Sequence, residues 1–258
     1  MQILAYAVSF VSVLVALYLI LAAPCLRRKG MSARLIAHRG LFDPQKGVPE
    51  NALGAFKAAC RAGYAIELDV QITLDGIAVV FHDDDLGRMC GVDGDIREMS
   101  FAELSALRLS GTDEHIPTFA EVLALVGGRV PLLVELKHNP RRTALVCAAL
   151  DALSGYQGEF VIESFDPMVL RELKKRDREV PRGQLVGRKS GVLSLLMFNC
   201  FSRPDFVAFE AGMARSWVIW VQRNLFRTPL AVWTLKSYEQ LEKQKNDAQM
   251  LIFDSFRP

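Results

Sequence analysis

The sequence contains no Cys-x-x-Cys pair, and its cysteines are few, scattered and odd in number. They are Cys25, Cys60, Cys90, Cys147 and Cys200. A disulfide framework needs an even set of cysteines, and structural zinc sites use closely spaced cysteine pairs. We therefore expect reduced thiols, and no zinc centre is indicated.

An excess of basic charge is also missing. The formal net charge is +2, and Arg27, Arg28 and Lys29 supply three of the 31 basic side chains. The rest of the chain therefore holds 28 basic and 29 acidic side chains, a net charge of −1. Proteins that bind nucleic acids present a basic face, so this balance argues against a nucleic-acid partner.

Charged side chains are absent from the first 26 residues. Residues 3–23, ILAYAVSFVSVLVALYLILAA, form an apolar run long enough to cross a bilayer, which takes about 20 residues. A buried core helix seldom stays apolar on every side. A cleaved signal peptide needs a basic segment before the apolar run and small residues at the cleavage site. Here no Lys or Arg precedes the run, and Pro24 stands before Cys25. We interpret residues 1–26 as an uncleaved transmembrane anchor.

A basic cluster follows the anchor, in a linker that we place at residues 27–33. Lys and Arg are enriched on the cytoplasmic side of membrane spans. The sequence therefore predicts a single-pass protein of the cell membrane whose residues 34–258 lie in the cytoplasm. Reduced thiols agree with that location.

The remaining chain shows no internal repeat and no low-complexity stretch, but strand-like and helix-like runs alternate along it. This alternation predicts a parallel sheet covered by helices, closed or open, and about 250 residues is usual for an α/β barrel. The predicted strands are 34–38, 65–70, 76–82, 131–137, 159–164, 183–187, 205–210, 230–235 and 250–254. The predicted helices are 51–62, 100–107, 118–126, 143–153, 166–176 and 238–246. Two of these helices open with capping boxes, Ser100 with Glu103 and Thr118 with Glu121.

Nine strands are one too many for an eight-stranded barrel. The link TLDG, residues 73–76, is too short for a crossover helix. We therefore expect the second and third strands to form a hairpin or one bent strand. Residues from about 90 to 117 read as a small insertion on the rim of the barrel.

Charged residues interrupt two of the predicted strands. Glu67 and Asp69 lie two apart, so their side chains point to the same face, and Glu135 and Lys137 repeat that spacing. One interpretation is an exposed sheet face with ordinary salt bridges. The other is a site at the carboxyl ends of barrel strands, where barrel enzymes place their chemistry. Three carboxylates there favour a hard cation, Mg²⁺, Ca²⁺ or Mn²⁺, over zinc.

Histidines end two strands near these carboxylates. His38 and His82 suit paired acid and base catalysis, because the ordinary pKa of histidine is about 6.5. Arg39 and Lys137 can bind phosphate oxygens, as a fork and as a point charge. His115 and His138 lie in polar loops, where we expect solvent exposure.

Several motifs occur in the order found in the glycerophosphodiester phosphodiesterase family, which the chain resembles from about Leu35 to its C-terminus. They are AHRG, PENALGAF, ELDVQITLDGIAVVFHDDDLGR, HIPTFAEVL, LLVELK, ESFDPMVL and VWTL. The resemblance implies a distorted (β/α)8 TIM barrel with a small insertion. It also implies hydrolysis of a glycerophosphodiester to glycerol 3-phosphate and an alcohol with one divalent cation.

The same resemblance assigns roles to residues. It implies that Glu67, Asp69 and Glu135 bind the metal, that His38 and His82 are the acid and base, and that Arg39 and Lys137 hold phosphate. In the family's usual mechanism the glycerol 2-hydroxyl attacks, and water opens the resulting cyclic phosphate. We assign the base to His38 and the acid to His82, although the sequence alone does not distinguish them.

The chain departs from the family pattern at a few positions. Ala52 stands where the motif usually has Thr, and the family's Trp-Thr-Val-Asn end reads Trp233-Thr234-Leu235-Lys236. We expect Trp233 to contact the substrate, and the departures concern substrate choice. Two alternatives therefore stay open: a lysophospholipase D acting at the membrane, and a membrane-tethered binding module without catalysis. The sequence gives no oligomeric state.

Residues 190–206 carry a crowd of apolar side chains: Leu193, Leu195, Leu196, Met197, Phe198 and Phe201. The segment is too short to span a bilayer. One interpretation is a helix buried against the outside of the barrel. The other is an interfacial helix near the mouth of the site, flanked by Arg188, Lys189 and Arg203, with Trp217 and Trp220 as further anchors.

Overall fold

The strands of the protein close into a barrel. The computed structural model describes residues 1–25, 27, 29–188 and 199–258. Its strands are β1 (Leu35–Ala37), β2 (Ala65–Ile72), β3 (Ala78–Val80), β4 (Leu132–Leu136), β5 (Phe160–Ser164), β6 (Arg182–Val186), β7 (Phe206–Glu210), β8 (Leu230–Leu235) and β9 (Met250–Phe253). β1 pairs in parallel with both β9 and β2, so eight parallel strands form a closed ring. The prediction of a TIM barrel is confirmed.

The extra strand is explained by a hairpin. β3 runs antiparallel to the end of β2, with Ile72 opposite Ala78, and lies outside the ring. The connection turns at Gly76, whose φ of +89° suits a residue without a side chain. The predicted hairpin between the second and third strands is confirmed.

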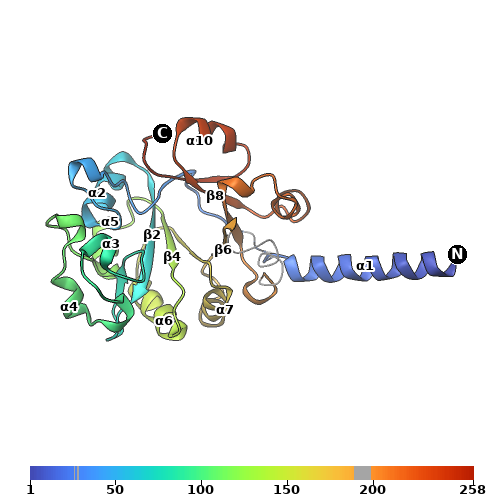
Figure 1. Cartoon of the computed structure of the whole chain (residues 1–258), viewed down its shortest axis with the longest axis horizontal. Helices are drawn as coiled ribbons and strands as arrows, with labels where there is room; N and C mark the ends of the chain where they lie inside the picture. The colour runs from blue at the N-terminus through green and yellow to red at the C-terminus, as the bar shows by residue number, and fades with distance from the viewer. Residues whose placement is uncertain (26, 28, 189–198) are drawn as a thin grey trace.

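Helices cover the outside of the barrel (Figure 1). The longer ones are α2 (Leu53–Ala62), α5 (Phe119–Val126), α6 (Arg142–Leu153), α7 (Pro167–Arg176) and α10 (Tyr238–Gln244). The short ones are α3 (Gly87–Cys90), α4 (Phe101–Ser105) and α9 (Trp217–Trp220), and α9 continues into the short π-helix η6 (Val221–Leu225). Both predicted capping boxes are present, at Ser100 and Thr118. The predicted start of α2 at Asn51 is wrong by two residues. Asn51 has a φ of +56°, and its side chain binds Asp69 instead of entering the helix.

The alternation of side chains along the strands places the core on both sides of the sheet. On β2, Ile66, Leu68 and Val70 pack outward against the helices. The inner face begins with apolar residues at the amino ends of the strands, among them Ala65 and Leu133. Further along β2 the inner face changes to Glu67 and Asp69, which are buried. The barrel therefore has an apolar floor and a charged interior near its mouth.

The stretch between β3 and α5 forms its own small apolar cluster. Phe81, Leu86, Ile96, Leu104 and Ile116 are among its buried members, and Val79 of β3 packs with them. This excursion corresponds to the insertion expected at about 90–117, and it begins with α3. Because α3 carries Arg88 toward the site, the insertion also contributes to the surroundings of the mouth.

The apolar N-terminus forms the helix α1 (Gln2–Ala22), which projects from the barrel as a single rod with the N-terminus at its far end (Figure 1). The helix has 21 residues, and an 18-residue stretch of it has a mean hydropathy of 2.5, so its length and composition suffice to cross a membrane. Its inner end is bonded to the barrel. The carbonyl of Ala22 accepts hydrogen bonds from Asn199 Nδ2 at 2.9 Å and Gln222 Nε2 at 3.0 Å.

Arg203 adds to this attachment, since its guanidinium donates to the carbonyls of Ile20 and Ala23, each at 2.9 Å. Within the predicted apolar segment, Leu193, Leu195, Leu196, Met197 and Phe198, together with Lys189, lie outside the described residues. The two interpretations of that segment stay predictions. No disulfide is formed by Cys25, Cys60, Cys90 or Cys147, as expected.

Candidate active site

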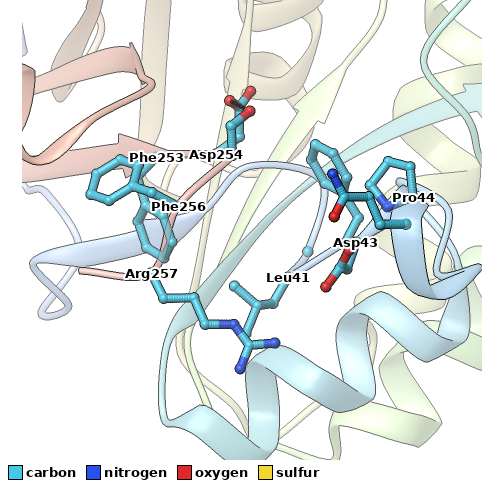
Figure 2. A pocket seen from close by; sticks show the side chains of 11 residues that line it. Leu41, Asp43, Pro44, Phe253, Asp254, Phe256 and Arg257 are labelled. Atoms are coloured by element: carbon cyan, nitrogen blue, oxygen red, sulfur yellow. Dashed lines mark hydrogen bonds between the residues drawn. The ribbon is translucent and has the colours of Figure 1, made fainter.

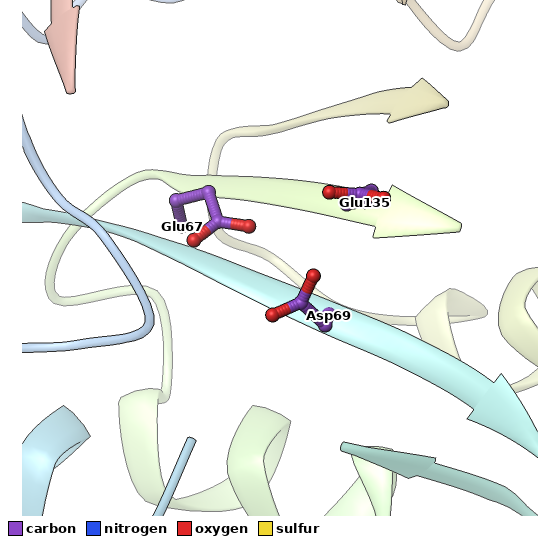
Figure 3. Close-up of side chains that lie close together, drawn as sticks. All are labelled: Glu67, Asp69 and Glu135. Carbon is purple, nitrogen blue, oxygen red and sulfur yellow. The ribbon is translucent and has the colours of Figure 1, made fainter. Parts of the chain in front are cut away.

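Three carboxylates converge on the inner faces of two neighbouring strands. Glu67 and Asp69 extend from β2, and Glu135 extends from β4, where it lies in register with Asp69 (Figure 3). One ligand oxygen from each residue lies within 4.8 Å of those of the other two, and all three residues are buried. The structure therefore brings together the three carboxylates that the sequence analysis singled out, and their role as metal ligands stays a prediction.

The electrostatics of this cluster suit a cation. Burial, followed by repulsion from Asp69 and Glu135, raises the pKa of Glu67 well above its ordinary value. Burial likewise raises the pKa of Glu135 to about 7, although Lys137 acts in the opposite direction. Burial would also raise the pKa of Asp69, but Lys137, His82 and Arg39 hold it below its ordinary value. Three buried, hard oxygen donors that repel one another fit a divalent cation of the Mg²⁺ or Ca²⁺ type.

Two cationic side chains border the carboxylates. Lys137 Nζ lies 2.9 Å from Glu135 Oε1 and 3.3 Å from Asp69 Oδ1. Arg39 Nε lies 3.5 Å from Asp69 Oδ2, and the backbone N–H of Arg39 donates to Glu67 Oε2 at 2.8 Å. The two cations therefore offset part of the negative charge of the three carboxylates.

A second set of ion pairs, centred on Glu50, holds the side chain of Arg39 in place. Its guanidinium lies 2.6 Å from Glu50 Oε1, and Arg88 binds the same carboxylate at 2.6 Å. These partners were not predicted. The motif PENALGAF contains two polar residues that pointed to such contacts, Glu50 and Asn51. Glu50 binds the two arginines, and the amide of Asn51 donates to Asp69 Oδ2 at 2.8 Å. Together they hold Arg39 and Asp69 in a fixed geometry.

His38 is oriented by a carboxylate from the other end of the chain. It follows β1, and its Nε2 lies 4.0 Å from Glu67 Oε2, while its Nδ1 lies 3.1 Å from Asp254 Oδ2. Burial would raise the pKa of Asp254, but the contacts with His38 and Ser255 lower it below its ordinary value. An ionised Asp254 only accepts hydrogen bonds, so the proton of neutral His38 belongs on Nδ1 and the Nε2 lone pair faces the site.

His82 has the same type of partner. It follows β3, and its Nδ1 lies 2.6 Å from Asp83 Oδ1. Asp83 is in turn bound by Arg88 Nε at 2.6 Å. Burial lowers the pKa of His82, and Lys137 and Arg39 lower it further, against the raising effect of Asp69 and Asp83. His82 is therefore mostly neutral at neutral pH before an anionic substrate binds.

These groups open into one small cavity of about 100 Å³. It is lined by the polar residues His38, Arg39, Glu67, His82, Glu135, Glu163 and Thr234 and by the apolar residues Phe165, Leu185, Trp233 and Ile252. Trp233 meets the ring of Phe165 edge-on, with centroids 5.6 Å apart. The prediction that Trp233 contacts the substrate is consistent with its position in this wall.

Glu163 is a site residue that the sequence analysis missed. It lies on β5 in register with Glu135, it is buried, and its Oε2 has no hydrogen-bond partner among the described residues. Burial raises its pKa well above the ordinary value, and Glu135 and Asp69 add to that effect. The signal was its spacing: Glu163 repeats on β5 the position that Glu135 occupies on β4.

A larger cavity of about 490 Å³ is lined in part by Asp254, the carboxylate partner of His38 (Figure 2). Residues 40–45 form one wall and residues 253–257 form the other, including Leu41, Phe256 and Asp254. Asp254 therefore contacts His38, which lines the small cavity, and itself lines the larger cavity. The remaining two histidines lie elsewhere: His138 is exposed beside Asp166, and His115 is partly exposed 3.5 Å from Glu121.

Known proteins share sequence with this chain over much of the barrel. Residues 38–208 match the model of the glycerophosphoryl diester phosphodiesterase family. A glycerophosphodiester phosphodiesterase of Caldanaerobacter subterraneus is 34% identical over 159 residues, which cover 56% of this chain and 63% of that protein. Human glycerophosphodiester phosphodiesterase 1 is 32% identical over 162 residues, covering 56% of this chain and 46% of that protein. The match thus spans about half to two thirds of the length of these relatives.

Solved structures show the same fold. The glycerophosphodiester phosphodiesterase of Thermotoga maritima has a TM-score of 0.71 at 28% identity, covering 88% of this chain and 96% of that one. A phosphodiesterase of Oleispira antarctica, solved in complex with its product sn-glycerol 3-phosphate, has a TM-score of 0.74 at 24% identity, covering 86% of this chain and 92% of that one. At that identity the second likeness concerns the fold alone.

Proposed function

The chain belongs to the glycerophosphoryl diester phosphodiesterase family, and from that membership we propose that it hydrolyses glycerophosphodiesters to sn-glycerol 3-phosphate and an alcohol. The observation that carries the proposal is the convergence of three buried carboxylates, two oriented histidines and two cations at one end of the barrel. The named activity of the relatives and the product bound in the Oleispira enzyme support the same reaction.

Glu67, Asp69 and Glu135 would hold one divalent cation. A cation bound there polarises the phosphoryl group and acidifies the attacking hydroxyl. The three carboxylates supply the charge that binds it, while Lys137 and Arg39 balance the anionic phosphate. Arg39, held by Glu50, presents a planar fork to two phosphate oxygens, and Lys137 presents a point charge.

His38 takes the role of general base in this proposal. Asp254 keeps the Nδ1 proton in place, so Nε2 is free to accept a proton from the glycerol hydroxyl. His82 takes the role of general acid and donates a proton to the leaving alcohol. Its pKa is lowered in the free protein, and a phosphate bound between Arg39 and Lys137 would favour its protonated form. The cyclic phosphate formed in the first step is opened by water with the roles reversed.

The test is the release of sn-glycerol 3-phosphate from glycerophosphocholine by the full-length protein in detergent. We expect product with Mg²⁺, Ca²⁺ or Mn²⁺ and none after chelation. A non-catalytic binding module would give no product under either condition. Turnover that persists unchanged in chelator would contradict the role of the carboxylates.

A lysophospholipid is the second candidate substrate, and the larger cavity of about 490 Å³ supports it. Leu41, Phe253 and Phe256 line that cavity with apolar side chains, together with Asp254, the partner of His38. An acyl chain attached to the glycerol would need such a wall, whereas a free glycerol would not. Comparing kcat/KM for lysophosphatidylcholine and glycerophosphocholine, with the variant Phe256→Ser, distinguishes the two. Loss confined to the lysophospholipid would support the second candidate, and no difference between the substrates would remove it.

We also propose that α1 stays attached as a membrane anchor. The last carbonyls of a helix lack partners within the helix, and here Asn199, Gln222 and Arg203 of the barrel supply them. A segment removed after export would gain nothing from such contacts. The basic residues Arg27 and Lys29 that follow favour a cytoplasmic barrel. Resistance to carbonate extraction, and protection from protease added to spheroplasts, are the expected results.

A further inference from the structure

Three large apolar side chains on α9 and on η6, which follows it, face solvent. Trp217 and Trp220 of α9 and Leu225 of η6 are 55%, 59% and 54% exposed. Their neighbours Val218 and Ile219 pack inward and hold α9 against the barrel. We call Trp217, Trp220 and Leu225 the α9 surface. Tryptophan is usually buried or placed at an interface, so this surface calls for a partner.

The α9 surface lies against the inner end of α1. The ring of Trp217 packs on the ring of Tyr18 with centroids 5.4 Å apart. One turn further along, Gln222 of η6 donates to the carbonyl of Ala22. Two separate contacts, four residues apart on α1, therefore fix the orientation of α9 relative to the anchor.

The length of α1 sets the depth of this contact. A helix of 21 residues is about 32 Å long at ~1.5 Å per residue, close to the ~30 Å of the hydrocarbon core. If α1 spans the bilayer, Ala22 lies at its boundary, and Tyr18 lies four residues or about 6 Å deeper. Trp217 packs at the level of Tyr18. Interfacial helices bury their apolar face to a depth of about 5–10 Å.

The charges around the surface fit lipid headgroups. No Asp or Glu occurs between Glu210 and Glu239. In that interval Arg215 and Arg227 are exposed, while Arg223 is paired with Asp247 at 3.0 Å. Exposed arginines beside exposed tryptophans, with no acid nearby in the sequence, are complementary to an anionic membrane surface.

We propose that the α9 surface lies in the headgroup region of the bilayer that α1 spans and forms a second membrane contact. This inference rests on the proposed anchor. With α1 inserted, α9 is tethered within reach of the lipid, so even a weak contact is populated through its high effective concentration. The second contact adds to the attachment of α1 in holding the barrel in one orientation on the membrane.

The test uses tryptophan fluorescence in the full-length protein reconstituted into vesicles of phosphatidylglycerol and phosphatidylcholine. The chain has three tryptophans, so Trp233→Phe leaves only Trp217 and Trp220. We expect phospholipids brominated in their acyl chains to quench most of this emission. The matched control replaces all three tryptophans by Phe and adds Leu74→Trp. Leu74 is 57% exposed, and it follows β2, which is four strands from β7 in either direction around the ring.

The control should be barely quenched. If Trp217 and Trp220 are quenched as weakly as the control, in protein that resists carbonate extraction, the α9 contact is wrong and the membrane anchor remains supported. Release of the protein by carbonate would overturn both. As a second measurement, Trp217→Ser with Trp220→Ser should keep turnover of glycerophosphocholine in detergent, since neither residue lines the small cavity. With α1 inserted in anionic vesicles, the double variant should also loosen the contact between the barrel and the lipid. A spin label on the barrel should then be more mobile than in the wild type.

Discussion

Replacing Asp254 by Asn changes one hydrogen bond to the imidazole of His38 and little else. Ser255 Oγ donates to Asp254 Oδ1 at 2.7 Å, and His38 Nδ1 lies 3.1 Å from Oδ2. In the variant Ser255 favours the amide oxygen on its own side, which turns the amide NH₂ toward His38. The imidazole then accepts at Nδ1 and carries its proton on Nε2, so it can no longer act as a base toward the site.

The magnitude follows from losing one oriented base. Such a group contributes roughly 10²–10⁴ to the rate, which corresponds to about 2.7–5.4 kcal/mol in the barrier. We expect kcat of Asp254→Asn to fall by that factor while KM and the melting temperature change little, as measured with glycerophosphocholine. Asp254 is a positioning residue, so rescue by Asp254→Glu is not expected to be complete.

A matched control exists in the same chain. His138 Nδ1 lies 2.8 Å from Asp166 Oδ2, an equivalent pair away from the site. Asp166→Asn keeps an oxygen for the N-terminus of α7 and should leave kcat unchanged. Wild-type kcat in Asp254→Asn, or an equal loss in both variants, would refute the role assigned to Asp254.

Three further predictions concern the carboxylates and the second histidine. Glu67→Ala, Asp69→Ala and Glu135→Ala should each abolish turnover and weaken cation binding measured by calorimetry, and a triple variant still active in chelator would show that the metal site is wrong. His82→Ala should lower kcat by roughly 10²–10⁴ with folding intact by circular dichroism, and full activity would remove His82 from the mechanism. The pKa of Glu163 is raised in the folded protein. The fold therefore loses stability as the pH rises above about 4.3, the pKa of this carboxyl in the unfolded chain. Glu163→Gln should therefore raise the melting temperature of the cation-free protein at pH 7 but not at pH 4, and an equal effect at both pH values would contradict the burial argument.

The barrel was predictable from the sequence because strand-like and helix-like runs alternate and because side chains of different polarity alternate along single strands. Alternation along β2 separated Ile66 and Leu68 from Glu67 and Asp69, and the short link after Ile72 required a hairpin. The same alternation on β4 placed Glu135 on the inner face beside Asp69. Local spacing thus sufficed for residues whose role depends on the face of a strand.

Residues whose role depends on distant partners were not predictable in this way. Asp254 meets His38 across 216 positions of the chain, and only the closure of β9 onto β1 brings them together. Glu50 and Arg88 meet through the fold of the insertion. The attachment of Ala22 to Gln222 depends on how α1 packs against the barrel, which no local pattern encodes.

The central claim is that one divalent cation, held by Glu67, Asp69 and Glu135, is required for hydrolysis. It is tested most directly by titrating the chelated full-length protein with Mn²⁺ while bound metal and the release of sn-glycerol 3-phosphate are followed in the same samples. The account predicts that both rise together and saturate at one ion per chain, and that Glu135→Gln loses both. Release of product at full rate without bound metal, or with metal bound equally well by Glu135→Gln, would contradict it.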